Sequence, residues 1–484
     1  MRGPQEIPWT NGRYRPESAA GRGAGGARPM LRPVDAEHES TTDDGPGAGR
    51  RSGRLLGAGL VLGLLTAGAV LAILISAPGG DRRPPDRTRA FATAEEFVDS
   101  VGVNVHMSYN DTPYGDLEGV RAALKDLGVR HVRDGIEPDR PDQYRALREL
   151  GRDGLRATLI VGKPGTDDLL ARLLDVAAGE VRPVLEALEG PNEYDVAGDD
   201  DWPASLREYQ DELVDGARSR LRGVPIVGPS LVERGSFGRL GDTGVRADLG
   251  NIHPYPGGQA PEPDIEDQLA LAVAVSGDRP VVATESGYHT AIEAEEGQPP
   301  VSERAAGIYL PRLYLEYFRR GIVRTFAYEL IDEFEDPGRT NPEANFGLLR
   351  RDFSPKPAFA ALANLMRLMQ PVPGGPTRTG SGRPELRVEG AGEGIRQLLL
   401  ERSDGAHLLA LWRDASVWDT GGRVDRDPPP RDVQVRLGQP VARVEVHRPS
   451  RSSRPEAVLR DARDIDLELT GDVAVLALEP TRGS

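Results

Sequence analysis

Two glutamates in this chain stand where they could act together on one bond. Glu193 closes the stretch Leu188-Glu189-Gly190-Pro191-Asn192-Glu193, which follows the apolar run 184–188, and Glu285 directly follows the apolar run 280–284. Hydrolysis of a glycosidic bond needs two carboxyl groups, one to protonate the leaving oxygen and one to act as nucleophile or base. Either glutamate alone would be read as a solvated charge or a helix cap. As a pair at the ends of two predicted strands, they indicate glycosidic-bond chemistry.

Other functional side chains also fall at the ends of predicted strands. In a barrel of parallel strands, the carboxyl ends and the loops that follow them form the active face. The residues placed there are Asn104, His106, Arg133, Lys163, Asn192, His253, Tyr255, Tyr328 and Glu329. We therefore expect one site with a carbohydrate substrate. It requires no metal ion and no cofactor, because two carboxyl groups suffice for this reaction.

The elements that would position these residues repeat along the middle of the chain. Between residues 92 and 370, short β-branched runs alternate with longer amphipathic stretches, which is typical of β/α units. The predicted strands are 101–105, 129–132, 156–161, 184–188, 225–227, 248–252, 281–284 and 323–328. The predicted helices are 117–127, 143–150, 167–178, 204–221, 265–274, 303–319 and 356–369, with a poorly defined one around 235–241.

Eight such strands predict an α/β fold of the (β/α)8 TIM-barrel type for the catalytic domain. A doubly wound parallel sheet is the alternative, but it would usually have fewer strands and a phosphate-binding loop. No glycine-rich phosphate motif opens a helix in this sequence. Residues 376–484 follow a Pro- and Gly-rich stretch and predict an antiparallel β-sandwich. Its expected strands are 395–401, 407–412, 433–437, 441–447 and 473–478.

The N-terminal part of the chain has a different character. Residues 1–54 are rich in Gly, Pro, Arg and Ser and predict a disordered tail. Residues 55–77 carry no charge and are long enough to span the hydrocarbon core of a bilayer as one transmembrane helix. A cleaved signal peptide would have a shorter apolar region that starts nearer the N-terminus. Residues 78–91 then form a polar stalk.

The predicted membrane segment also predicts where the protein is located in the cell. We expect a single-pass protein of the cell membrane whose catalytic domain is extracellular, since a hydrolase of external glycans would act there. Arginines flank the apolar segment on both sides, so the charge rule for orientation does not decide. The net charge of −16 argues against a nucleic-acid partner. The absence of cysteine excludes disulfides, thiolate metal sites and cysteine nucleophiles.

Together these motifs resemble the glycoside hydrolase superfamily called clan A, whose members are retaining (β/α)8-barrel enzymes. The resemblance is carried by Asn192-Glu193, by His253-Pro254-Tyr255, by Glu285 and by the closing stretch 345–359. It implies a retaining mechanism with Glu193 as acid/base and Glu285 as nucleophile. Two departures leave the substrate open, because Tyr194 stands where Pro is commonest, and Phe326 and Tyr328 are the candidates where a Trp platform is frequent.

Physical arguments support the same roles. Arg133 near Glu285 would lower the pKa of that carboxyl group, and Tyr255 could donate a hydrogen bond to it. Glu193 lacks such a cation and would keep its proton near neutral pH. Asn192 would hold the sugar hydroxyl next to the anomeric centre.

The remaining candidates have more than one reading. His106 and His253 would line the same sugar subsite, although the neighbours of His106 also suggest packing. We expect the acidic loop 332–336 to be a solvated rim rather than a calcium site, because it lacks calcium-loop spacing. We expect Trp412 and Trp418 to be core residues. Two other functions stay open: a catalytically silent carbohydrate-binding barrel and a transglycosylase that uses the same glutamates.

Overall fold

The computed structural model describes residues 87–479, apart from 166–167, 199, 242–244, 372–382 and 391. The predicted tail 1–54, the predicted membrane segment 55–77 and the stalk up to residue 86 lie outside the described residues. Among the helices that the structure describes, none is long and apolar enough to cross a bilayer.

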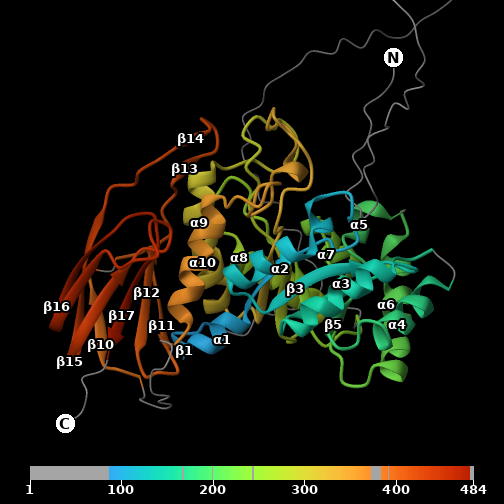
Figure 1. Ribbon diagram of the computed structural model, residues 1–484, viewed down its shortest axis with the longest axis horizontal. Helices are drawn as coiled ribbons and strands as arrows, with labels where there is room; N and C mark the ends of the chain where they lie inside the picture. Colours follow the sequence, from blue (N-terminus) through green and yellow to red (C-terminus); the bar gives the residue numbers. More distant parts are fainter. Residues whose placement is uncertain are drawn as a thin grey trace, which may run out of the picture. The chain divides into compact units, whose positions relative to one another are not determined.

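Eight parallel strands form one sheet that closes on itself (Figure 1). Its order is β6-β5-β4-β3-β2-β9-β8-β7, and a bridge between Val227 and Leu249 joins the two ends. The strands are β2 (Val101–Asn104), β3 (His131–Ile136), β4 (Arg156–Val161), β5 (Leu185–Glu189), β6 (Ile226–Val227), β7 (Gly250–Ile252), β8 (Val281–Ser286) and β9 (Arg324–Ala327). The predicted TIM barrel is confirmed.

Helices connect these strands close to where the sequence predicts them. They are α1 (Ala94–Asp99), α2 (Leu117–Leu127), α3 (Pro141–Arg152), α4 (Leu169–Ala178), α5 (Tyr194–Ala197), α6 (Trp202–Arg220), α7 (Arg234–Leu240), α8 (Ile265–Ser276), α9 (Glu303–Arg319) and α10 (Pro357–Met369). α2 shows why the boundaries are readable. The Asp116 side chain accepts a hydrogen bond from Gly119 N at its start, and Gly128 ends it with φ 77°.

A second sheet follows the barrel in the chain and encloses an apolar core of its own, formed by β11, β12 and β15–β17. Its strands are β1 (Phe91–Thr93), β10 (Leu386–Glu389), β11 (Ile395–Glu401), β12 (His407–Arg413), β15 (Arg431–His447), β16 (Ala457–Leu469) and β17 (Ala474–Glu479). The pairing of β15 with β16 shifts register between Arg436 and Val441. The first part of β15 pairs with β10, and its last part pairs with β17. The short pair β13 (Trp418–Asp419) and β14 (Val424–Asp425) lies outside this sheet.

Three details of this second sheet differ from the sequence prediction. The runs 433–437 and 441–447 are one continuous strand, and β10 and β16 were not predicted at all. The sheet is mixed rather than purely antiparallel, because β1 pairs in parallel with β11. Residues 91–93 therefore complete the second sheet, although the sequence places residue 92 at the start of the barrel.

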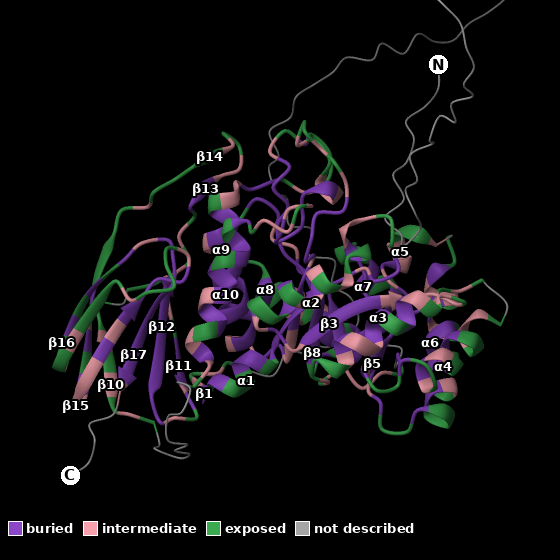
Figure 2. Cartoon of the chain, in the orientation of Figure 1, coloured by how far each residue is buried: buried purple, intermediate pink, exposed green. Residues whose placement is uncertain are grey.

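Helix α9 has both of its sides covered, and Figure 2 shows it as buried along most of its length. On one side, the Tyr314 hydroxyl donates to the carbonyl of Gly102 in β2 and accepts from the amide of Ala327 in β9. On the other side, Tyr309 and Arg312 contact the segment 415–417, which follows β12. The helix thus links the barrel strands to the second domain.

Candidate active site

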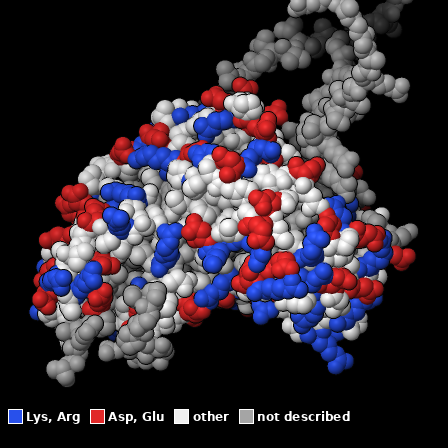
Figure 3. All heavy atoms as spheres, in the orientation of Figure 1, with Lys and Arg blue, Asp and Glu red and all other residues white. Residues whose placement is uncertain are grey.

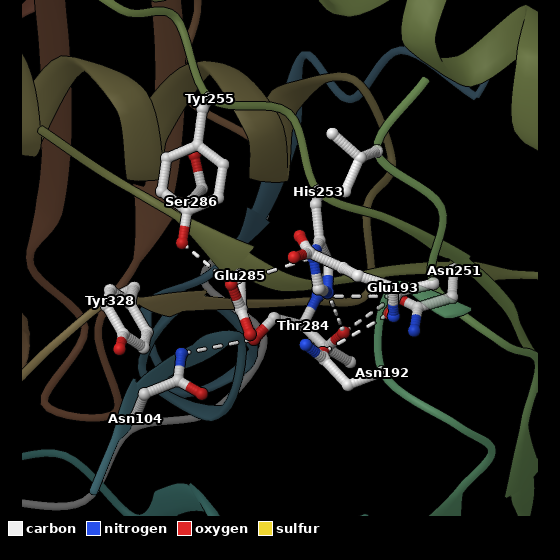
Figure 4. A network of polar contacts seen from close by, with 12 residues as sticks. Asn104, Asn192, Glu193, Asn251, His253, Tyr255, Thr284, Glu285, Ser286 and Tyr328 are labelled. Carbon is white, nitrogen blue, oxygen red and sulfur yellow. Dashed lines mark hydrogen bonds and ion pairs between the residues drawn. The ribbon is translucent and has the colours of Figure 1, made fainter. Parts of the chain in front are cut away.

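The two glutamates come from opposite strands of the barrel, and both side chains reach one region at its carboxyl end (Figure 4). Glu285 lies within β8, which continues past the predicted end at residue 284. Glu193 follows β5 and adopts a left-handed backbone conformation with φ 47° before the short helix α5. Its amide donates to Ser230 Oγ at 3.0 Å, which fixes this turn.

The carboxyl groups of Glu193 and Glu285 lie close to each other. One oxygen of each, together with His253 Nδ1, lies within 4.8 Å of the others. Both residues are 8% exposed, so each carboxyl group is nearly buried yet still reaches solvent. In retaining glycosidases, the two carboxyl groups are about 5–5.5 Å apart, whereas inverting enzymes need room for a water between them. The nearest oxygens of the two carboxyl groups are no more than 4.8 Å apart.

Glu285 is surrounded by groups that stabilise its charged form. Arg133 NH1 lies 2.5 Å from Oε1, and the Tyr255 hydroxyl donates to Oε2 at 2.7 Å. Burial opposes ionisation, but the charges of His253 and Arg133 and these hydrogen bonds outweigh it, so the pKa of Glu285 is lowered. Glu285 is therefore a carboxylate at neutral pH, as a nucleophile must be.

Arg133 is itself held by a carboxylate that the sequence reasoning missed. Its Nε and NH2 atoms each lie 2.7 Å from an oxygen of Glu189, the last residue of β5. Asn251 Nδ2 and the Thr284 hydroxyl also donate to Glu189 Oε1, at 3.1 and 3.0 Å. The fully buried Glu189 thus fixes the guanidinium plane that contacts Glu285. A sequence signal existed, since Glu189 ends an apolar strand next to Gly190.

Asn192 lies on the other side of the same guanidinium group. Its Oδ1 accepts hydrogen bonds from Arg133 NH2 at 2.6 Å and from Ser230 Oγ at 3.3 Å. With Oδ1 directed at these donors, the Nδ2 amide group makes no hydrogen bond to the residues that the structure describes. It is available to a hydroxyl group of a ligand beside Glu285.

Glu193 has the opposite electrostatic surroundings. Burial raises its pKa and the nearby charge of Glu285 adds to the rise, while the bond to His253 acts in the other direction. The net effect raises the pKa of Glu193 above its ordinary value. Two carboxyl groups whose pKa values are pushed apart in this way are suited to act as acid and nucleophile.

His253 links Glu193 to Thr284 in strand β8. Its Nδ1 lies 2.7 Å from Glu193 Oε1, and its Nε2 lies 2.9 Å from Thr284 Oγ1. The Thr284 hydroxyl has one hydrogen, which it donates to Glu189 or Asn251, so it accepts from the Nε2–H group of His253. The proton between Nδ1 and Glu193 is then shared by these two groups. The charge of Glu285 and the bond to Glu193 raise the pKa of His253 against the effect of burial.

The structure gathers most of the predicted site residues and separates four of them, which are Lys163, His106, Tyr328 and Glu329. Arg133, Asn192, His253 and Tyr255 surround the two glutamates, with Asn104 Oδ1 accepting from Arg133 at 3.0 Å. Lys163 contacts none of these side chains among the described residues.

His106 and Tyr328 lie in a neighbouring group instead. The His106 ring has its centroid 5.6 Å from that of Tyr328 and lies against Glu329 and Glu333. Figure 4 draws Tyr328 near Glu285, so the group around His106 adjoins the residues around the two glutamates.

We predicted that the acidic loop 332–336 forms a solvated rim, and this prediction is wrong for its first two acidic residues. Asp332 and Glu333 are 7% and 4% exposed. Lys356 Nζ lies 2.8 Å from Asp332 and accounts for the burial of that charge. Glu335 is exposed as expected. Trp412 and Trp418 are buried core residues, in agreement with the expectation.

The distribution of charged side chains on the surface bears on whether nucleic acid can bind there. Figure 3 shows acidic and basic side chains interspersed over the face drawn, without a continuous basic area. That distribution, with the net charge of −16, offers no electrostatic footprint for nucleic acid on this face.

Comparison with known proteins identifies similar folds. No protein-family model matches the sequence, and no curated protein matches it either. A family 39 glycoside hydrolase from Bacteroides cellulosilyticus WH2 superposes with a TM-score of 0.55 at 15% identity, covering 80% of this chain and 82% of that one.

Two further structures are similar over both domains. The GH39 enzyme from Xanthomonas axonopodis pv. citri has a TM-score of 0.52 at 15% identity, with coverage of 82% and 95%. A monomeric β-xylosidase from Caulobacter crescentus CB15 has a TM-score of 0.52 at 16% identity, with coverage of 82% and 97%. At these identities the likeness establishes a shared fold.

Proposed function

We propose that this protein is a retaining glycoside hydrolase that cleaves O-glycosidic bonds of an oligo- or polysaccharide. The observation that carries the proposal is the facing pair of Glu193 and Glu285, with the pKa of one raised and that of the other lowered. The solved proteins that share this fold include glycoside hydrolases and a β-xylosidase, which supports the same class of reaction.

The geometry supports a double displacement. In the first step, a Glu285 oxygen bonds to the anomeric carbon while the Glu193 carboxyl group gives its proton to the departing oxygen, and the C–O bond breaks. In the second step, Glu193 as carboxylate takes a proton from water, whose oxygen bonds to the anomeric carbon and releases Glu285. The pair returns to its starting protonation state, and one water is consumed.

The surrounding residues serve these two steps. Arg133 and Tyr255 keep Glu285 charged and fix its direction. Asn192 can donate to the sugar hydroxyl nearest the anomeric carbon. His253 Nδ1 lies 2.7 Å from Glu193 Oε1 and fixes the direction of that carboxyl group, which regains its proton from the attacking water.

Two substitutions test the assignment. Glu285→Gln removes the nucleophile and should lower kcat by about 10⁴-fold or more. Glu193→Ala removes only proton transfer and should cost about 10²–10⁴-fold on ordinary glycosides, while aryl glycosides with good leaving groups retain the first step. Rates on a panel of nitrophenyl glycosides and oligosaccharides measure both effects. Glu335→Gln, an exposed residue, is the control.

Three outcomes would change the conclusion. Full activity of the Glu285 variant would refute the mechanism. Binding of glycans without hydrolysis by the native protein would favour a silent binding barrel. Products larger than the substrate, formed only when acceptor sugars are present, would favour a transglycosylase.

We further propose that the protein is anchored in the cell membrane through residues 55–77, with the catalytic domain outside. The support is the uncharged apolar stretch in the sequence, long enough to span a bilayer. Retention of the full chain in membranes after alkaline carbonate washing tests the anchor, and release into the wash would contradict it. Protease treatment of intact cells tests the orientation.

A further inference from the structure

Two groups of the same composition lie in this barrel, and each contains one histidine and two glutamates. One is Glu193, His253 and Glu285, and the other is His106, Glu329 and Glu333. In each group, the three atoms able to bind a metal lie within 4.8 Å of one another. The two groups differ in how their polar atoms are satisfied.

The first group needs no further partner. Both ring nitrogens of His253 have hydrogen-bond partners, and both oxygens of Glu285 accept hydrogen bonds, from Arg133 and Tyr255. Its acidic charge is matched within hydrogen-bond distance by a guanidinium group. It is a complete catalytic arrangement as it stands.

The second group lacks these partners. His106 Nε2, Glu329 Oε1 and Glu333 Oε1 are buried and make no hydrogen bond. Glu329 is fully buried and Glu333 is 4% exposed. Among the described residues, no lysine or arginine lies within ion-pair distance of either carboxyl group. Two buried carboxyl groups with a single imidazole beside them are costly in their ionised form unless they take up protons or a cation joins them.

The spacing of these atoms suits one shared ion. His106 Nε2 lies 3.2 Å from Glu329 Oε2 and 3.8 Å from Glu333 Oε1. In a tetrahedral zinc site with bonds of about 2.0–2.1 Å, neighbouring ligand atoms are about 3.3 Å apart. Small rotations of the side chains would bring all three atoms to that distance.

The three side chains are also held in place by other residues. The Tyr114 hydroxyl donates to Glu329 Oε2 at 3.1 Å and accepts from the Ile331 amide. The His106 ring stacks on Tyr109 with centroids 5.0 Å apart and meets the rings of Tyr114 and Tyr328 edge-on. Support of this kind around metal ligands orients them and raises affinity.

We propose that His106, Glu329 and Glu333 form a binding site for one divalent transition-metal ion, such as Zn²⁺ or Mn²⁺. Imidazole and carboxylate ligands suit these ions, and three protein ligands leave a coordination position open. The His106 side chain is 13% exposed, although its Nε2 atom is buried. The His106 ring lies against Tyr328 with centroids 5.6 Å apart, and Tyr328 is drawn in the same network as Glu285 in Figure 4.

Zinc binding to the full chain tests the proposal. Protein freed of metal with a chelator is titrated with ZnCl₂ by calorimetry, and Co²⁺ absorption reports the coordination geometry. We expect one equivalent to bind to the native protein. Glu333→Gln should weaken binding by about tenfold or more, since it removes one of three charged or basic ligands. The matched control is Glu335→Gln, the same change at an exposed position two residues along the loop.

Two further measurements make the result decisive. Glu193→Gln should leave zinc binding unchanged, which separates this site from the catalytic group. Glu285→Gln should also bind one equivalent, so the outcome does not depend on hydrolysis. Circular dichroism establishes that each variant is folded. Failure of the native protein to bind zinc, equal binding by Glu333→Gln, or loss of binding in Glu193→Gln would each overturn the proposal.

Discussion

At the scale of single residues, the site depends on one proton shared between Glu193 and His253. His253 donates from Nε2 to Thr284, so its Nδ1 faces Glu193 Oε1 across 2.7 Å. When the shared proton lies on Glu193, Nδ1 of the imidazole is unprotonated, and when it lies on Nδ1, a positive imidazole faces a Glu193 carboxylate. The positive form of His253 also lowers the pKa of Glu285. One imidazole therefore influences the acid and the nucleophile together.

We predict that His253→Asn moves both limbs of the pH profile of kcat/KM to higher pH. Activity rises as Glu285 ionises and falls as Glu193 loses its proton. His253 opposes the rise in the pKa of Glu193 and supports the lowering of the pKa of Glu285, so its removal raises both values. We expect each limb to move by about one pH unit or more. Rates on a nitrophenyl glycoside from pH 4 to pH 9 measure the shift, with His447→Asn in the second domain as control. Limbs that stay in place or move to lower pH would contradict the shared proton.

The sequence was a good guide to the residues that end strands and a poor one to those that support them. Glu193, Glu285 and Arg133 follow or lie within apolar runs, so strand geometry alone brings them to one edge. Glu189, Ser230 and Thr284 support them through hydrogen bonds to residues far away in the chain. Ser230 and Thr284 are ordinary residues for strand ends and turns, and no spacing marks them, whereas the position of Glu189 at the end of an apolar strand was a signal in the sequence. Only the closed barrel shows what they contact.

At the scale of elements, helix α9 contributes Arg312 to a buried ion pair within the barrel, and the same arginine joins the helix to the second domain. The Nε and NH2 atoms of Arg312 lie 2.8 and 2.7 Å from the two oxygens of Glu262, in the loop between β7 and α8. Its NH1 atom donates to the carbonyls of Ala415 and Gly471. Both charged side chains are almost completely buried. A buried charge that loses its partner is strongly destabilising, whereas removal of both charges can be neutral.

We therefore predict that Arg312→Leu lowers the free energy of unfolding by about 3–5 kcal/mol, because Glu262 is left buried without a cation. The double variant Arg312→Leu with Glu262→Leu should recover much of that loss. Urea unfolding followed by circular dichroism measures all three proteins. The pair would be unimportant if the single variant lay within about 1 kcal/mol of the native protein, which is the range of an exposed ion pair.

Elements were predictable where burial produces a simple pattern. The barrel strands are short apolar runs, and seven of the predicted helices have counterparts whose ends differ by a few residues. β3 continues through Arg133 and Asp134, where the sequence suggested a strand end, because Arg133 is paired with Glu189 and Glu285 and Asp134 accepts a hydrogen bond from the Met107 amide. β16 escaped prediction for another reason. It pairs only with β15, so most of its side chains are exposed; Ile465, Leu467 and Leu469 are buried in the core, and Leu459 and Ala462 pack against it partly buried.

At the scale of the whole molecule, the barrel and the second domain form one compact unit. One core cluster contains barrel residues together with Leu398, Leu408 and Trp412 of the second sheet. Arg423 donates to the carbonyls of Ile292 and Ala294, both at 2.6 Å, in the loop that follows β8. β1 precedes the barrel in the chain and pairs with β11 beyond it. The Arg423 contacts join the second domain to the loop that follows β8, the strand of Glu285.

We predict that the fragment 79–484 unfolds in a single cooperative transition. Trp202 reports on the barrel and Trp412 on the second sheet, and both are buried. Trp412→Phe with Trp418→Phe leaves the first probe, and Trp202→Phe with Trp418→Phe leaves the second. In each variant, tryptophan fluorescence and far-UV circular dichroism should have the same urea midpoint, because coincident transitions are the mark of two-state unfolding. Each variant is compared only with itself, so the stability cost of the substitutions does not affect the result.

If the Trp412 signal changed at a lower urea concentration than the circular dichroism, the second domain would unfold independently. Arg312 and Arg423 would then connect the barrel to a domain that folds and unfolds by itself.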